Sequence, residues 1–486
     1  MTFAESRLDA APLDLLVVGV FLTGLVALGF SAKLRDHSTL QYLTAGRNLS
    51  LPAFVATLVS TWYGGILGIG ESAFAFGLGT WVLMGLPYYV FGVLYALWLA
   101  PRVRDGAQIS IPERLEARFG RGPALVGAVL LFLLAAPAAH VLMLGVLVNA
   151  VTGLPILPAV LVAVVIGTLF LWKGGLLADV RVAMLAFLMM YVGFAVITVY
   201  SLINHPPAEA FAELRGSPLW TWDGGQGPLF VLSLFILGAW TLVDPGFHQR
   251  VASAASPEIG RRGVLISVGF WMLFDLLSIT AGLYAVVLLP DTLASASSLD
   301  RLAAFPRLGM AVLPPGLRAL FFCGMIGTIV SALVGYGLIS GATLGREIVA
   351  RLRSESQEAE VQKWSKLGIA FSFAVAVAVG LSLQSVVSLW YAWAGAVVGA
   401  MLIPLLASYT TTGLANVSGA AIAMVTATAA VVSLAWMVYG QRTGNPYLSV
   451  QLGKETLSVG TLLPGLAISA IGLGGAHFLA IIRKRP

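Results

Sequence analysis

The chain has 486 residues, of which 58% are hydrophobic and only 10% are charged, and its mean hydropathy is +0.92. Because soluble domains carry about 25% charged residues, this composition excludes an ordinary soluble protein and predicts an all-α polytopic membrane protein embedded in a lipid bilayer. The net charge of +6 would suggest a nucleic-acid partner in a soluble protein, but here the positions of the basic residues explain it by membrane orientation, and no nucleic-acid partner is expected.

Residue types that carry enzyme chemistry are scarce. The single cysteine, Cys323, lies in an apolar run, and there are five histidines and no HExxH, CxxC or Walker-type motif. No nucleophile, base or metal ligands pair within the membrane segments, so we expect neither an enzyme nor a cofactor. The short, mildly acidic N-terminus lacks the features of a cleaved signal peptide, and the first span is expected to be retained.

Apolar runs of about 20 residues, the length that crosses a bilayer, predict thirteen membrane spans. The spans are expected at residues 13–31, 52–76, 79–101, 123–151, 154–172, 181–203, 229–247, 262–289, 317–343, 367–384, 387–408, 417–440 and 459–481.

The basic residues predict the orientation of these spans. One set of alternate connecting segments holds 21 of the 28 lysines and arginines, so the positive-inside rule places the N-terminus outside and the C-terminus in the cytoplasm of a plasma membrane protein. Two connectors are longer than the rest, residues 105–122 and 347–366. The first is expected to hold a short helix that starts near Ser110 with Pro112 in its first turn. The second carries alternating charges and is interpreted as a cytoplasmic extension of the ninth span, and for both a solvated connector is the favoured interpretation.

The second span contains an unusual stretch, VSTWYGGILGIGE, at residues 59–71. Its four glycines each cost about 0.5–1 kcal/mol in a helix interior. One interpretation is a broken membrane helix whose unwound centre offers carbonyls and hydroxyls to a solute or ion; the other is a small-residue stripe for close helix packing. We favour the site because Ser60, Thr61, Trp62, Tyr63 and Glu71 crowd around the glycines.

Other ionisable residues lie inside the spans. Asp275 is in the middle of the eighth span without polar neighbours on its helix, which favours a structural hydrogen bond over a functional role, whereas both roles stay open for Glu71. His140 could face a solute path or simply pack. The seventh span ends in Asp-Pro-Gly, which breaks a helix; Asp244 and Arg250 there could form a gate pair at the cytoplasmic surface or cap the helix end.

Polar and aromatic groups recur on two later spans. Thr328 and Ser331 lie three residues apart on the ninth span, so one helix face presents both oxygens. Such hydroxyls suit a hard cation such as sodium, although back-bonding to the preceding turn is the favoured interpretation when the pair is taken alone. Trp390, Tyr391 and Trp393 open the eleventh span, as an interfacial belt, which we favour, or as a lid.

Several stretches together resemble the sodium:solute symporter family, which has a LeuT-type core. Residues 42–49 resemble the family's GGR-x-L motif, and residues 68–77 its G-x-P/G-x-x-Y-x-x-G run. The resemblance extends to Lys173–Gly175 at the start of the sixth span, to residues 244–255 (DQ…QR-x-x-A-A in the family) and to residues 343–348 (S-x-x-x-x-x-D-I).

The resemblance implies one transporter domain, residues 1–486, that works by alternating access as a sodium-coupled symporter of a small organic solute. Two inverted five-helix repeats with broken first helices would occupy residues 52–203 and 229–408, with peripheral helices at 13–31 and 417–481. The implied sodium ligands are backbone oxygens near Val59 and Trp62, the carbonyl of Thr328 and the hydroxyl of Ser331. We expect the solute to bind among Ser60, Thr61, Trp62, Tyr63, Tyr88, Tyr89 and Trp240.

The chain also departs from the family pattern. Ala332 stands where a second Ser or Thr is usual, and Asp179 comes four residues too early in the sixth span, at its expected cytoplasmic end. Family positions for Thr, Asp and Gln in that span are occupied by Val182, Ala183 and Ala186. A proton-coupled carrier with Glu71 as the titrating group, or an uncoupled one, is therefore the alternative, and a non-transporting solute sensor is a weaker one.

Overall fold

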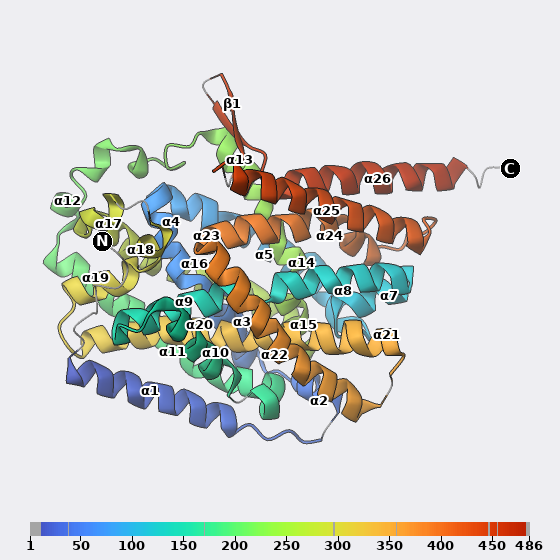
Figure 1. Cartoon of the computed structure of the whole chain (residues 1–486), viewed down its shortest axis with the longest axis horizontal. Coiled ribbons are helices and arrows are strands. Elements are labelled where there is room, and N and C mark those ends of the chain that lie inside the picture. Colours follow the sequence, from blue (N-terminus) through green and yellow to red (C-terminus); the bar gives the residue numbers. More distant parts are fainter. Residues whose placement is uncertain are drawn as a thin grey trace.

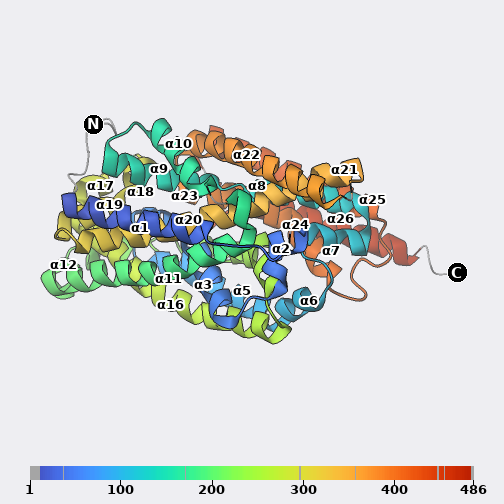
Figure 2. The ribbon, with the colours of Figure 1, turned by 90° about the horizontal axis from the view of Figure 1, so that it is seen from below.

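The computed structural model describes residues 11–482, except 37, 170, 295–296, 356, 446–447 and 454. Its long helices lie side by side, with α1 and α26 at opposite edges of the molecule (Figures 1 and 2). Eleven helical segments are long and apolar enough to cross a membrane, and two shorter apolar helices occupy the remaining predicted spans. Each of the thirteen predicted spans thus corresponds to a helix in the described part of the chain.

The first half of the chain contains spans one to six and the connectors between them. In order, the helices are α1 (Pro12–Phe30), α2 (Thr39–Thr44), η1 (Ala45–Arg47), α3 (Leu51–Trp62), η2 (Tyr63–Gly65), α4 (Ile66–Phe76), η3 (Trp81–Gly85), α5 (Leu86–Leu94), η4 (Tyr95–Leu99), α6 (Ala100–Asp105), α7 (Ile111–Phe119), α8 (Arg121–Ala135), α9 (Ala138–Thr152), α10 (Ile156–Thr168) and α11 (Leu171–Asn204).

The second half contains spans seven to thirteen, with short helices and a β-hairpin between some of them. The elements are α12 (Pro207–Ala210), η5 (Leu214–Gly216), η6 (Pro218–Trp220), α13 (Pro228–Phe235), η7 (Ile236–Ala239), α14 (Trp240–Val243), α15 (Pro245–Ser253), α16 (Pro257–Leu288), α17 (Pro290–Ala294), α18 (Ser298–Leu302), α19 (Ala304–Val312), α20 (Leu317–Ala342), η8 (Thr343–Ala350), α21 (Arg351–Arg353), α22 (Glu358–Leu383), α23 (Val386–Leu389), η9 (Trp390–Ala394), α24 (Gly395–Ser408), α25 (Gly419–Arg442), β1 (Ser449–Leu452), β2 (Glu455–Ser458) and α26 (Leu462–Ile482).

Burial separates a central pair of spans from the edge. In the apolar windows of α3–α4 and of α20, 89% of the residues are buried, compared with 22% for α1 and 17% for α26. An apolar helix that is buried all round belongs to the core of a bundle, whereas one with exposed leucines faces lipid. The second and ninth spans therefore form the centre of the molecule, and the division into two inverted repeats stays a prediction.

The sixth span begins ten residues earlier than the sequence predicted. α11 starts at Leu171 and passes through a kink at Gly175, where φ is +50°. A Cβ added at Gly175 would lie 2.2 Å from the carbonyl oxygen of Tyr42, so only glycine fits this turn against α2. The predicted start was wrong because Arg181 was assigned to a loop; its guanidinium instead donates to Ser31 O at the molecular edge, 2.6 Å away.

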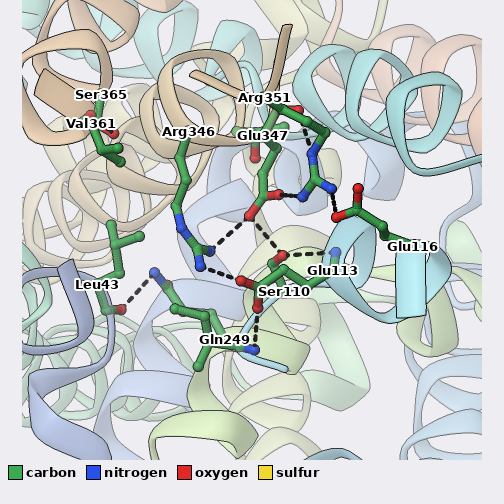
Figure 3. A network of polar contacts seen from close by, with 12 residues as sticks. Leu43, Ser110, Glu113, Glu116, Gln249, Arg346, Glu347, Arg351, Val361 and Ser365 are labelled. Carbon is green, nitrogen blue, oxygen red and sulfur yellow. Dashed lines mark hydrogen bonds and ion pairs between the residues drawn. The ribbon is translucent and has the colours of Figure 1, made fainter. Parts of the chain in front are cut away.

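The two longer connectors are not simply solvated, which corrects the prediction. α7 begins after Ser110, whose hydroxyl accepts from Glu113 N as expected, but the Glu347 side chain is only 4% exposed and pairs with two arginines. We call the following set the Glu347 network: Ser110, Glu113 and Glu116 of the α7 region, and Arg346, Glu347 and Arg351 of the η8–α21 region (Figure 3).

The Glu347 network joins the two connectors through short polar contacts. Ser110 Oγ donates to Glu347 Oε1 at 2.7 Å, Arg346 Nη1 donates to the same oxygen at 2.8 Å, and Arg351 Nη2 donates to Glu347 Oε2 at 2.5 Å. Arg346 also pairs with Glu113, and Arg351 with Glu116. Alternating charges on a predicted helix indicated a solvated face, but here opposite charges from two helices neutralise each other in a partly buried interface.

Candidate functional site

The interruption in the second span is a single tightened turn. α3 passes into α4 through the 3-10 turn η2, in which Tyr63 N donates to Val59 O and Ile66 N donates to Tyr63 O. The sequence predicted an unwound stretch here. The structure has a tighter turn whose backbone donors at these two positions are already used inside the helix.

The ninth span approaches this turn very closely. A Cβ added at Gly64 would lie 2.0 Å from the Cβ of Ala332, so α20 can approach the turn only because residue 64 has no side chain. Ala332, the departure from the family pattern, is itself fully buried in this contact. The contact between the turn η2 and α20 therefore depends on a glycine in the turn and an alanine on the helix.

Ser331 is the hydroxyl that faces the second span. Ser60 Oγ donates to Ala56 O at 2.8 Å, so it accepts from Ser331 Oγ, 3.0 Å away. The Thr328 hydroxyl donates instead to Met325 O of its own helix at 2.9 Å. Back-bonding thus describes Thr328 but not Ser331. The Thr328 hydroxyl is thus engaged within α20, and its predicted role as a sodium ligand through its carbonyl stays a prediction.

A buried ion pair lies next to this contact. Arg250 Nη2 donates to Asp179 Oδ2 at 2.9 Å and to Thr61 Oγ1 at 2.7 Å, and the two charged side chains are 1% and 0% exposed. Asp179 was expected at the cytoplasmic end of its span; α11 begins earlier, at Leu171, and the Asp179 side chain is fully buried in the ion pair.

Asp244 and Arg250 do not pair with each other, so of the two interpretations the helix cap is the one observed. Asp244 accepts from Phe247 N at 3.0 Å and so caps α15. The same carboxylate accepts from Trp240 Nε1 at 3.1 Å and from Tyr336 Oη at 2.9 Å. Both residues are buried, not at the surface, and Asp244 connects α14, α15 and α20.

A cavity of about 120 Å³ lies beside the turn. Five of the seven predicted solute-binding residues line it, namely Thr61, Trp62, Tyr63, Tyr88 and Trp240. The other two do not: Ser60 faces Ser331, and Tyr89 Oη donates to the Asp275 carboxylate.

Further residues complete the cavity wall. Asp275 lines it, although a purely structural role was favoured from the sequence, and His140 lines it while stacked on Tyr336 at 5.3 Å between ring centroids. Trp390 and Trp393 also line it, so the interfacial belt was the wrong choice for these two residues. Tyr336 was missed because a lone tyrosine in an apolar helix gives no signal of the cavity that it faces.

Trp62 is the centre of the aromatic packing around the cavity. Its ring meets Tyr88 edge-on at 4.9 Å and Trp240 at 6.4 Å, and on its buried side it contacts Phe247 at 5.4 Å and Trp271 at 5.5 Å. Such edge-to-face pairs hold a side chain in one orientation. The residue that ends α3 is thereby fixed between the cavity and the core.

Glu71 lies away from the cavity and has its own partners. It accepts from Ser385 Oγ at 2.6 Å, from Val386 N at 3.1 Å and from Val387 N at 3.3 Å. These donors belong to the first turn of α23, where an anion is favourable. The carboxylate thus fastens the second span to the start of the eleventh.

Comparisons with known proteins agree with this architecture. The rabbit (Oryctolagus cuniculus) sodium/glucose cotransporter 1 is 22% identical over 422 residues, covering 75% of this chain and 62% of that protein. The mouse (Mus musculus) sodium/myo-inositol cotransporter is 23% identical over 436 residues, covering 76% and 58% respectively. The chain spans about three fifths of the length of these curated relatives.

A solved structure and a family model complete the comparison. A Na⁺-coupled sialic acid symporter in a substrate-bound outward-open state matches with a TM-score of 0.76 at 16% identity over 98% of both chains, which confirms the LeuT-type fold. The model of the sodium:solute symporter family matches residues 42–427. Since that match covers most of the chain, this multi-pass membrane protein belongs to the sodium:solute symporter family.

Proposed function

We propose that the protein is a secondary active transporter that carries a small organic solute together with sodium across the plasma membrane by alternating access. The proposal rests on membership of the family and on the names of its relatives, which are sodium cotransporters of glucose and myo-inositol. The excess of basic residues in alternate connectors supports an external N-terminus and a cytoplasmic C-terminus.

The observation that carries the proposal is the contact of Ser331 with Ser60 of α3, two residues before Trp62, which leads into the turn and lines the cavity. Ser331 Oγ lies 3.0 Å from Ser60 Oγ, fully buried between α3 and α20. We propose that sodium takes the hydroxyl of Ser331 and carbonyl oxygens of Val59, Trp62 and Thr328, an all-oxygen set that suits a hard cation. The Ser60–Ser331 hydrogen bond is the contact that the ion would replace.

The same turn supports coupling between ion and solute. Trp62 would contribute its carbonyl to the ion while its ring lines the cavity. An ion that fixes this turn reduces the ordering cost of solute binding, and the coupling is reciprocal, at about 1–3 kcal/mol in typical cases. Solute affinity is therefore expected to rise about 5- to 150-fold when sodium is present.

The test is the melting temperature of the purified protein in sodium and in potassium at equal ionic strength. A bound ion at about 100 times its dissociation constant stabilises by about 2.7 kcal/mol. Ser331→Ala should lose the sodium-specific rise. Thr328→Val is the matched control, because it removes a hydroxyl from the same helix face but keeps the carbonyl. A wild-type protein that melts alike in both salts would contradict the proposal.

The proton-coupled alternative has less support. Its titrating group, Glu71, is held by three donors at the start of α23 and does not line the cavity. If this alternative were correct, uptake would follow a pH gradient in the absence of sodium, and Glu71→Gln would abolish that dependence.

A further inference from the structure

The charge of the cavity lining is one-sided. Among the described residues that line the cavity, Asp275 alone carries a formal charge, and no lysine or arginine is present. Asp275 is 2% exposed and accepts from Tyr89 Oη. A hydroxyl supplies a hydrogen bond but no countercharge, and a buried carboxylate is costly without one. A positive charge on the solute would provide that countercharge.

The nearby cationic group is engaged elsewhere. Arg250 reaches the cavity only through Thr61, because its guanidinium pairs with Asp179 and donates to the Thr61 hydroxyl. The helix turn also offers little to an anion, since Tyr63 N and Ile66 N donate within the second span. A carboxylate on the solute would therefore meet one like charge and no cation in this cavity.

The walls suit a cation as well. Trp62, Tyr88, Trp240, Trp390 and Trp393 line the cavity. A cation placed over an aromatic face lowers its binding free energy by about 0.5–1 kcal/mol at exposed sites and by about 2 kcal/mol when desolvated. Proteins bind quaternary ammonium groups in aromatic cages of this kind. The volume of about 120 Å³ is close to that of a cavity that holds benzene, about 150 Å³, so the solute is small.

Two buried ring nitrogens of the lining have no partner. His140 Nδ1 and Trp393 Nε1 are inaccessible to solvent and make no hydrogen bond among the described residues. An unsatisfied buried polar atom costs about 1–3 kcal/mol, so Trp393 Nε1 is suited to an acceptor on the solute, and His140 Nδ1 to an acceptor or a donor according to its tautomer. A sugar or inositol carries five or six hydroxyls, more than these two ring nitrogens match.

We propose that the cavity binds a small organic cation, a quaternary or protonated alkylamine with a short polar tail, whose charge faces Asp275 within the aromatic walls. This inference rests on the proposed function, because it names the substrate class of the same site. The names of the relatives mention glucose and myo-inositol, and neither of these solutes carries a positive charge that could pair with Asp275.

The test uses a pair of probes of the same shape. Choline and its uncharged isostere 3,3-dimethylbutan-1-ol are titrated into the purified full-length protein in sodium buffer, with tryptophan fluorescence and calorimetry as readouts. Choline should bind and the isostere should bind at least about 30-fold more weakly, the smaller end of the loss expected when one member of a buried charge pair is removed. Acetate, glucose and myo-inositol should not compete.

Asp275→Asn keeps the shape of the side chain and removes its charge, so choline should lose at least about 30-fold in affinity while the isostere is unaffected. Glu71→Gln is the control, a buried carboxylate outside the cavity, and should bind choline as the wild type does. Folding of each variant is checked by its sodium-specific melting shift. The inference would be overturned if choline and the isostere bound equally, or if glucose, myo-inositol or acetate bound in place of choline, while the sodium-specific melting shift remained. If the wild-type protein showed no sodium-specific melting shift, the proposed function would be refuted instead.

Discussion

Removing the charge of Asp179 should destabilise the protein far more than removing a carboxylate at the surface. Arg250 donates to Asp179 Oδ2, to Thr61 Oγ1 and, at 3.4 Å, to Gly246 O, and its Nε has no partner. In Asp179→Asn the guanidinium keeps only neutral acceptors in a site that is about 1% exposed. Breaking a buried pair in this way costs about 3–5 kcal/mol, measured as the free energy of unfolding by SDS in mixed micelles.

A surface pair provides the matched control. Glu258 and Arg262 pair at one end of α16 with side chains 49% and 67% exposed, so Glu258→Gln should change the free energy of unfolding by less than about 1 kcal/mol. The double variant Asp179→Leu with Arg250→Met replaces both charges by apolar groups and should recover most of the loss. A single-variant cost below about 1 kcal/mol, or a double variant no more stable than Asp179→Asn, would refute the reasoning.

Three further outcomes follow from the packing. Gly64→Ala should push α20 away from the turn, because the new Cβ would lie 2.0 Å from that of Ala332, and it should abolish the sodium-specific melting shift. Gly474→Ala is the control, because its new Cβ would meet nothing within 4 Å; it should leave the free energy of unfolding unchanged or raise it by up to about 1 kcal/mol. Glu347→Gln should cost about 2–4 kcal/mol in SDS unfolding, since it leaves two partly buried arginines without their shared carboxylate. Glu71→Gln should leave the pH dependence of uptake unchanged, and a loss of that dependence would favour proton coupling.

The sequence predicted the spans well because membrane crossing imposes a length and a composition on each helix. It also located the interruption in the second span at Gly64 and Gly65, although Gly64 also provides the close packing against Ala332 that was the other interpretation of these glycines. The N-cap at Ser110 followed from local chemistry, because a serine before a proline-led turn satisfies a free backbone donor. These features depend on residues close together in the chain, which a sequence displays directly.

Other features depend on partners far away in the chain. Whether Asp179 lies at a helix end or inside depends on how Gly175 packs against Tyr42, more than 100 residues earlier. Trp390 could be a belt or a wall because an aromatic group suits both a lipid interface and a cavity, and only its position over Gly65 and Gly68 decides. The charges of the Glu347 network resembled a solvated face until their partners were known.

The three hydrogen bonds of Asp244 have a mechanical consequence. Trp240 and Tyr336, which form part of the cavity wall, share one carboxylate with the first turn of α15. The two rings donate to Oδ2, whereas Oδ1 caps the helix, so a solute that displaces either ring removes a hydrogen bond that orients the capping carboxylate; such a cap contributes about 1 kcal/mol. A solute in the cavity would therefore affect the orientation of the carboxylate at the start of α15, the helix that also carries Arg250.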